Sequence, residues 1–189
     1  NEKAAIYKKI YTDCVSACSD KGCIGSFVFL WGWQSHGDVL NWYAMYDQFE
    51  ASALPTVEAM EEMWTGEAPM NSAPVIASRE DGKTGGKIYI DGRTSDQSIA
   101  LAHGSQHMAS VDATDPDGDE LTYDWKIIPD VRQDVGKAMS PIAGLFTGKM
   151  GAQVNFKAPS ATGYYRLIVY VRDKAHGTAS CAVIPFKVN

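Results

Sequence analysis

Large apolar residues at every second position restrict the fold of this chain more than any other feature. Residues 121–127 read Leu-Thr-Tyr-Asp-Trp-Lys-Ile, and residues 167–171 read Leu-Ile-Val-Tyr-Val. A period of two places such residues on one face of a β-strand, so that one face of each strand packs into a core. The second part of the chain is therefore predicted to fold as an antiparallel, all-β unit.

Seven candidate strands are separated by clusters of Gly, Pro and Asp. About seven short strands in roughly 115 residues predict a β-sandwich of the immunoglobulin-like type. The stretch 129–151 has no such pattern and is predicted to be a long loop, and residues 81–86 are predicted to form a hairpin turn. The candidate strands are 74–79, 86–91, 106–113, 120–128, 152–157, 163–173 and 178–188.

The first part of the chain predicts helix, strand, loop and helix. Apolar residues at helical spacing predict a helix over 2–19, and a second helix begins at Pro55. Residues 23–31 are apolar on both faces, which is typical of a buried parallel strand. We therefore expect an α+β chain with a helix–strand–loop–helix segment over 1–66, a Pro-containing linker over 67–74 and the sandwich over 75–189.

Charge is distributed unevenly between these two parts. The net charge is −6, and all of it lies in residues 1–70, which hold four basic and ten acidic residues. An acidic chain is not expected to bind nucleic acid. The longest apolar run, residues 23–33, is too short to span a bilayer. Because the chain begins at Asn1 rather than Met, we expect a mature or trimmed piece of a longer protein.

An aspartate-rich turn precedes the strand at 120–128. Pro116 and Gly118 favour a tight turn, in which the aspartates cap backbone amides. The alternative is a calcium site, because Asp115, Asp117 and Asp119 offer oxygen ligands at alternate positions. The segment resembles the D-P-D-G-D-x-L-x-Y-x-W stretch of bacterial immunoglobulin-like, cadherin-like and polycystic-kidney-type domains; it reads Asp-Ala-Thr-Asp-Pro-Asp-Gly-Asp-Glu-Leu-Thr-Tyr-Asp-Trp over 112–125.

The Trp-rich stretch after residue 25 reads Gly-Ser-Phe-Val-Phe-Leu-Trp-Gly-Trp, and Trp42 and Tyr43 follow it. With its flanking helices, it resembles the last turn of the (β/α)8 barrel of clan-A-type glycoside hydrolases. The resemblance implies that Trp31 floors a sugar subsite at the end of strand 8, with Trp33, His36 and Trp42 around it. Core or rim packing of the two tryptophans, and a plain surface histidine, are the alternatives.

No complete catalytic apparatus is predicted. The resemblance implies two catalytic carboxylates on strands that would lie before Asn1, and glycoside hydrolysis needs both. Asp38, Asp47 and Glu50 lie in the predicted loop without an opposing strand. The cysteines Cys14, Cys18 and Cys23 lack zinc-binding spacing and are expected to be buried free thiols, although a disulfide is not excluded.

The sequence therefore predicts the C-terminal fragment of a secreted glycoside hydrolase, catalytically incomplete by itself, with a sandwich that acts as a spacer. The alternatives are a carbohydrate-binding or adhesive cell-surface module and a pure scaffold. We expect a carbohydrate partner, an extracytoplasmic location, no required cofactor except the candidate calcium ion, and no nucleic-acid partner. Because residues 1–66 would expose barrel-facing surfaces, they are expected to form a homodimer or to dock on the sandwich.

Overall fold

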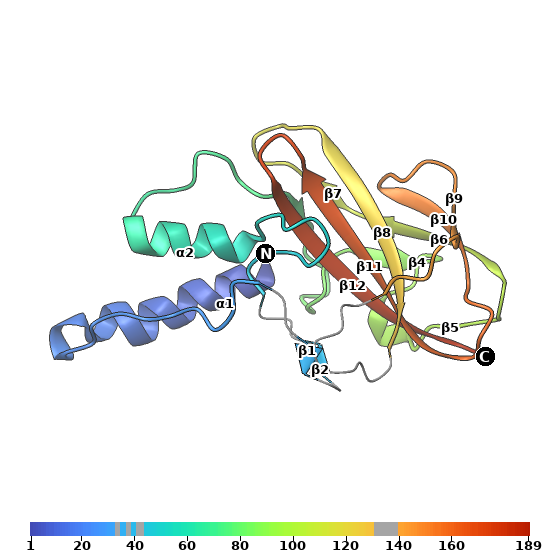
Figure 1. Cartoon of the computed structure of the whole chain (residues 1–189), viewed down its shortest axis with the longest axis horizontal. Coiled ribbons are helices and arrows are strands. Elements are labelled where there is room, and N and C mark those ends of the chain that lie inside the picture. The colour runs from blue at the N-terminus through green and yellow to red at the C-terminus, as the bar shows by residue number, and fades with distance from the viewer. Residues whose placement is uncertain (33–34, 37–38, 41–43, 131–139) are drawn as a thin grey trace.

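The chain is α+β and mostly β, as predicted. The computed structural model describes residues 1–32, 35–36, 39–40, 44–130 and 140–189. Two helices lie in the first part of the chain, before the strands of the two four-stranded sheets (Figure 1). The helices are α1 (Glu2–Ile10) and α2 (Pro55–Thr65), and the strands are β1 (Ser35–His36), β2 (Val39–Leu40), β3 (Val75–Ile76), β4 (Ile88–Ile90), β5 (Ala100–Leu101), β6 (Gln106–Val111), β7 (Ala113–Thr114), β8 (Leu121–Pro129), β9 (Phe146–Thr147), β10 (Gln153–Lys157), β11 (Gly163–Asp173) and β12 (Thr178–Val188).

Two four-stranded sheets form the sandwich. One has the strand order β4-β6-β10-β9 and the other β5-β12-β11-β8. Pairing is antiparallel throughout both sheets except between β12 and β5, which are parallel. Two short pairs, β1-β2 and β3-β7, complete the sheets of the described residues.

The hydrophobic core lies between the two sheets. Trp125, Phe156 and Leu167 are buried there, on three different strands. The Trp125 Nε1–H also donates a hydrogen bond of 2.9 Å to the Gly151 carbonyl oxygen, which satisfies the one polar atom of that side chain. The alternation that predicted the strands therefore also identifies the side chains that fill the core.

The predicted strands 163–173 and 178–188 coincide with β11 and β12. The predicted strand 106–113 is instead divided into β6 and β7, because Asp112 belongs to neither strand and β7 pairs with β3. The predictions missed β5 and β9, which have only two residues each and therefore show no periodicity. β9 lies within the stretch that was predicted to be a long loop.

The first predicted helix is confirmed, but its geometry changes along its length. α1 continues as a π-helical turn over Tyr11–Val15 and a 3-10 turn over Ser16–Lys21, and Gly22 ends it in the left-handed conformation. All four cysteines are free thiols, and free thiols were expected at Cys14, Cys18 and Cys23. The expectation that they are buried is wrong, since Cys14 is exposed and Cys18 is half-buried on a helix that the sandwich does not cover.

The second predicted helix, α2, begins with Pro55 at its first position and ends at Gly66 in the left-handed conformation. α2 packs beside α1, and Lys8 and Glu62 form an ion pair between them. Figure 1 shows both helices extending away from the sandwich. In the described part of the chain, neither helix is long and apolar enough to cross a membrane.

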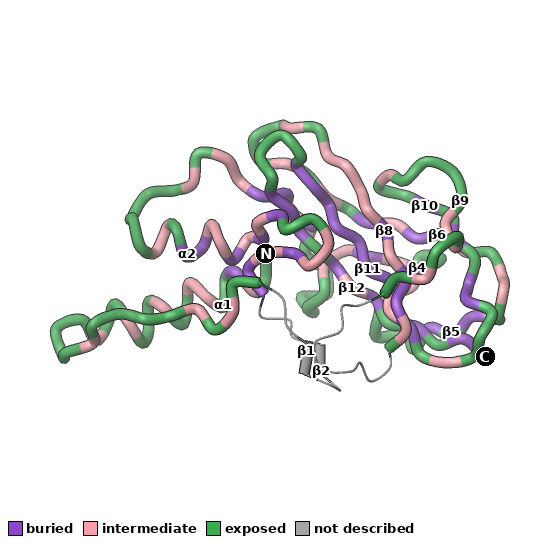
Figure 2. The backbone as a smooth tube through the Cα atoms, viewed as in Figure 1, coloured by how far each residue is buried: buried purple, intermediate pink, exposed green. Residues whose placement is uncertain are grey.

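The prediction of a buried parallel strand over 23–31 is wrong. Residues 23–30 belong to no strand of the described sheets, and the chain there runs back along α1 in an extended, irregular path. Ile24 and Phe27 are fully exposed. Figure 2 shows most of the stretch beside α1 as exposed. Apolarity on both faces indicated a segment suited to burial, but in the structure only Cys23, Val28 and Leu30 of this run are half-buried, and none of its residues is fully buried.

Residues 44–54 attach the first part of the chain to the outer face of the sandwich. Ala53 pairs with the start of β12 through a hydrogen bond of 2.9 Å from the Ala179 N–H to its carbonyl oxygen. Beneath it lies Arg172, which is buried and donates from Nη1 to Asp47 Oδ2 at 2.9 Å and to the Ser52 hydroxyl at 2.7 Å. Phe49 packs edge-on against Tyr170 beside this pair. The loop therefore covers the only buried arginine among the described residues.

The segment predicted to be a linker, 67–74, is hydrogen-bonded both to the sandwich and to α2. Asn71 Nδ2 donates to Asp173 at 3.0 Å, and the Ser72 N–H donates to Asp117 at 2.7 Å. The Ala73 N–H donates to Glu58 of α2. Residues 71–73 thus connect α2 to the end of the sandwich that carries the β11–β12 hairpin and the turn before β8.

Candidate functional site

Trp31 lies in a cluster of three aromatic rings. Its ring centroid is 6.3 Å from that of Tyr46 and 6.1 Å from that of Trp64 on α2. The Trp31 carbonyl oxygen accepts the N–H groups of both Met45 and Tyr46 at 3.1 Å, which fixes the backbone at this position. Trp31 and Trp64 remain 46% and 48% exposed, so the cluster presents aromatic surface to solvent.

The other predicted sugar-site residues are not placed by the structure. Trp33 and Trp42 lie outside the described residues, and only the backbone of His36 is described, as part of β1. Trp31 does not end a strand, because the predicted strand is absent. Sequence reasoning missed Tyr46 and Trp64 as neighbours of Trp31, since the contact joins three segments far apart in the chain.

The three turn aspartates have separate roles. Asp115 Oδ1 accepts the backbone N–H groups of residues 117, 118 and 119 at 2.9–3.2 Å, which is the predicted capped turn. Asp117 accepts the Ser72 N–H and so holds the preceding segment. Asp119 points instead toward His176 in the β11–β12 hairpin. Calcium at these three residues stays a prediction.

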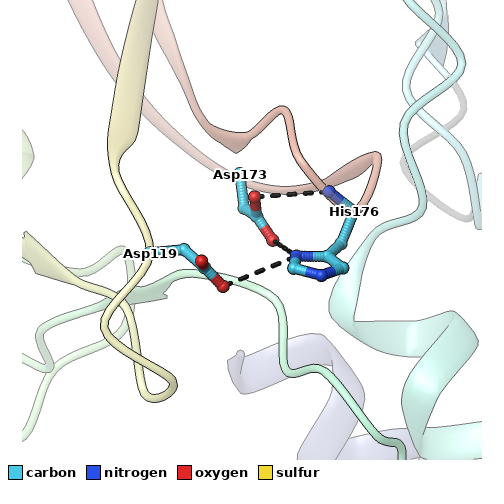
Figure 3. Close-up of side chains that lie close together, drawn as sticks. All are labelled: Asp119, Asp173 and His176. Atoms are coloured by element: carbon cyan, nitrogen blue, oxygen red, sulfur yellow. Dashed lines mark hydrogen bonds and ion pairs between the residues drawn. The ribbon is translucent and has the colours of Figure 1, made fainter.

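Asp119, Asp173 and His176 form the one group of three or more ligand-capable side chains found among the described residues (Figure 3). His176 Nδ1 is 2.9 Å from Asp173 Oδ2 and 3.5 Å from Asp119 Oδ2. Asp173 is 1% exposed, whereas the His176 side chain is half-exposed. Asp173 and His176 were missed from the sequence because only the fold of the hairpin brings them to the aspartate turn.

Hydrogen bonds keep the Asp173 carboxylate charged. Burial alone would raise its pKa, but donation from His176, Asn71 and the Ala175 N–H outweighs burial and lowers the pKa below its ordinary value. Glu58 lies near the same end of the sandwich and behaves oppositely. Burial raises its pKa to about 7, despite the hydrogen bond from the Ala73 N–H. The acidic groups at this end therefore differ in how strongly they are held ionised.

A network of hydrogen bonds joins Ser105, His107 and Asp91 on the other sheet. His107 Nε2 is 2.6 Å from the Ser105 hydroxyl, and Nδ1 is 2.7 Å from Asp91 Oδ2. A surface cavity of about 420 Å³ is lined by Asp91 and His107, with Asn155 and Thr147 on the same outer side. Ser105 does not line that cavity and also bonds to the Ala102 carbonyl oxygen. We therefore assign these hydrogen bonds a structural role: they hold the turn at Asp91 against β6.

The predicted loop carboxylates are engaged in the attachment to the sandwich. Asp47 pairs with Arg172, and Glu50 lies 3.6 Å from the same guanidinium. Burial acts to raise the pKa of Asp47, but Arg172 and the N–H groups of Glu50 and Phe49 lower it to about 2. Asp38 lies outside the described residues.

A comparison with solved structures gives a distant likeness. No family model matches the chain, and no curated protein matches it. The chain is similar to a solved structure from Saccharophagus degradans, described as a nucleoside hydrolase-related hypothetical protein associated with carbohydrate metabolism. The TM-score is 0.38 and the sequence identity 18%, over 70% of this chain and 29% of that one. The chain therefore spans less than a third of the length of that protein.

Proposed function

We propose that this chain is the C-terminal, non-catalytic portion of an extracytoplasmic carbohydrate-active hydrolase. In this proposal residues 1–66 complete a larger domain, and the sandwich is a spacer fixed to that domain. The observation that carries the proposal is the exposure of the apolar run 23–31. The resemblance of this region to the end of a hydrolase barrel supplies the class of the larger domain.

The exposed run is suited to pairing as a strand. It already follows an extended path, and its Ile24 and Phe27 are fully exposed. Ile6 and Ile10 of α1 are also more than half exposed. Contiguous apolar patches beyond a few hundred Å² mark interaction surfaces on soluble proteins. An extended segment can add to the edge of a sheet, where backbone hydrogen bonds and apolar side chains both contribute. A sheet edge of the larger domain is the partner that fits this surface.

The state of the loop carboxylates supports a non-catalytic role. A glycoside hydrolase holds two carboxyl groups across a substrate groove, roughly 5–10 Å apart. Asp47 instead has its oxygens taken by Arg172 and by backbone N–H groups. A carboxylate with a pKa of about 2 is a poor general acid or base near neutral pH.

The test compares this chain with the longer polypeptide encoded by its gene. We expect the longer polypeptide to hydrolyse a polysaccharide or aryl glycoside, and the 189-residue chain to show no turnover. Amide hydrogen exchange over 23–31 should be fast in the short chain and slow in the longer one. Hydrolysis by the short chain, equal exchange in both, or the lack of a longer reading frame would overturn the proposal.

A second interpretation is that another copy of this chain covers the same surface. Light scattering distinguishes it from coverage by the larger domain. If residues 1–66 are covered by another copy, the short chain is a dimer and Phe27→Asp makes it a monomer. If the larger domain covers them, the short chain binds that domain when the two are mixed. Exchange protection over 23–31 then appears only in the mixture.

A sugar-binding module is the second candidate, and the cluster of Trp31, Tyr46 and Trp64 favours it. Aromatic faces stack on the apolar face of a pyranose ring, and two of these rings are half-exposed. Affinity electrophoresis in polysaccharide gels tests it with Trp31→Ala. Phe27→Ala is the matched control, since it removes an exposed aromatic side chain outside the cluster. Retardation that is lost in both variants, or in neither, would count against the cluster as a sugar surface.

A further inference from the structure

Two loops meet at one end of the sandwich, and together they form one small polar cluster. Asp119 comes from the turn before β8, and Asp173 and His176 come from the hairpin that joins β11 and β12. One carboxylate oxygen of each aspartate and one imidazole nitrogen lie within 4.8 Å of one another. Two metal–ligand bonds of 2.0–2.2 Å span at most about 4.4 Å, so one ion can contact all three atoms if the widest separation closes slightly on binding.

The carboxylates of the cluster offer more hydrogen-bond acceptors than His176 has protons to donate to them. A neutral imidazole carries a single proton, and His176 Nδ1 faces both Asp173 Oδ2 at 2.9 Å and Asp119 Oδ2 at 3.5 Å. If Nδ1–H donates to Asp173, the Asp119 carboxylate is left facing a second carboxylate. A divalent cation would satisfy both carboxylates and the deprotonated nitrogen together.

A buried hydroxyl beside the cluster is an independent sign of a missing ligand. Thr178 is 8% exposed, and its Oγ1 has no hydrogen-bond partner within the described part of the chain. Thr178 lies directly opposite Asp173 in the β11–β12 ladder, so the two side chains project on the same side of the sheet. Buried hydroxyl groups are almost always satisfied, which makes an ion or its bound water a physical partner for this one.

Asn71 orients Asp173, the most buried of the three candidate ligands. Its Nδ2 donates to Asp173 Oδ2 at 3.0 Å, and the N–H groups of Ala175 and His176 donate to Asp173 Oδ1. Such outer hydrogen bonds orient carboxylate ligands before a metal arrives. His176 is half-exposed, which leaves a path for the ion from solvent.

We propose that Asp119, Asp173 and His176 form a binding site for a divalent transition-metal ion of the zinc type. Zinc favours a mixture of imidazole and carboxylate ligands, whereas calcium takes six to eight oxygens. The site shares only Asp119 with the calcium site predicted from the turn. It is independent of the proposed function, because it requires neither a sugar nor a larger domain.

The binding test uses the full chain freed of metal. Isothermal titration with Zn²⁺ should give one site per chain, and the affinity should fall at least tenfold in both His176→Gln and Asp119→Asn. His103→Gln and Asp112→Asn are the matched controls, since these residues lie outside the cluster and should leave the affinity unchanged. Zn²⁺ should also raise the melting temperature of the wild type, and EDTA should reverse this rise.

A direct readout comes from the ring nitrogens of His176. Binding of Zn²⁺ should shift the Nδ1 resonance of this histidine in a ¹H–¹⁵N correlation spectrum and leave His103 in place. The proposal is overturned if Zn²⁺ does not bind, or if His176→Gln binds it as tightly as the wild type does. It is also overturned if Ca²⁺ alone binds and Asp117→Asn abolishes that binding. Matching far-ultraviolet spectra in EDTA establish that each variant is folded.

Discussion

The two parts of this chain handle apolar side chains in opposite ways. The sandwich buries Trp125, Phe156 and Leu167 between two sheets of its own. The first 32 residues bury only Ala4 and leave Ile24 and Phe27 in solvent. The contrast teaches that apolar content alone does not make a core, because a core also needs a second layer to face. The sandwich supplies both of its layers, while the helices and the run 23–31 supply one.

Truncating one phenylalanine in each part should give the largest contrast. Phe156→Ala removes a fully buried ring and should cost about 3–5 kcal/mol in the free energy of unfolding. Phe27→Ala removes a fully exposed ring and should change it by less than about 0.5 kcal/mol. Urea unfolding followed by Trp fluorescence measures both. A loss above about 1 kcal/mol for Phe27→Ala would mean that this chain buries the run in solution by itself.

The junction between the parts should be nearly as sensitive. Arg172→Ala leaves Asp47 buried without its partner, and breaking a buried ion pair in this way costs about 3–5 kcal/mol. Lys9→Ala breaks the exposed pair with Asp13 and should leave the free energy of unfolding almost unchanged. Limited proteolysis should also cleave 44–54 faster in Arg172→Ala. Equal stability of the two variants would show that the loop is not held by this pair.

Acid should weaken the same junction. The pKa of Asp47 is about 2 in the folded chain and 3.8 in its ordinary state, so the folded state favours the ionised carboxylate. This contribution is fully present above about pH 4 and is lost as the pH falls to about 2, which amounts to roughly 2 kcal/mol. Unfolding of the wild type and Asp47→Asn at pH 5 and pH 2.5 measures it. Asp13→Asn is the exposed control, and a pH dependence as steep in Asp47→Asn as in the wild type would contradict the assignment.

The smallest expected difference is between substitutions at two glycines that have the same φ angle. Gly82 and Gly86 both have φ of 71°, where an alanine is strained by about 1–2 kcal/mol. At Gly86 an added Cβ would also lie 2.8 Å from Ile76 Cγ2, whereas at Gly82 nothing lies within 4 Å. Gly86→Ala should therefore be the less stable of the two by thermal unfolding. Equal melting temperatures would mean that Ile76 moves aside at no cost.

The sequence predicted the sandwich well because its information is local. Eleven-residue strands such as β11 and β12 carry their own alternation, and Pro55 and Gly66 mark the ends of α2. Two-residue strands such as β5 show no period and could not be found. The run 23–31 misled the prediction because a buried strand and an uncovered apolar segment have the same composition.

The candidate sites were harder to predict because they depend on contacts between distant segments. Asp119 was singled out by its turn, but its partners Asp173 and His176 lie more than fifty residues away. Trp31 was singled out by its aromatic neighbours in sequence, while its neighbours in space are Tyr46 and Trp64. Nothing in a single sequence indicates that Arg172, on a strand of the sandwich, meets Asp47.

The position of Arg172 has a mechanical consequence. β11 is hydrogen-bonded to β8 and to β12 along its length, and Arg172 lies at the end of β11 that meets the first part of the chain. A pull on the helices along the strand axis would load the ladder bonds on both sides of β11 in shear, all at once. By comparison, residues 44–54 are attached by a few contacts: the ion pair with Asp47, the backbone pairing at Ala53 and the packing of Phe49. Under tension these few contacts should therefore break while the two sheets of the sandwich stay intact.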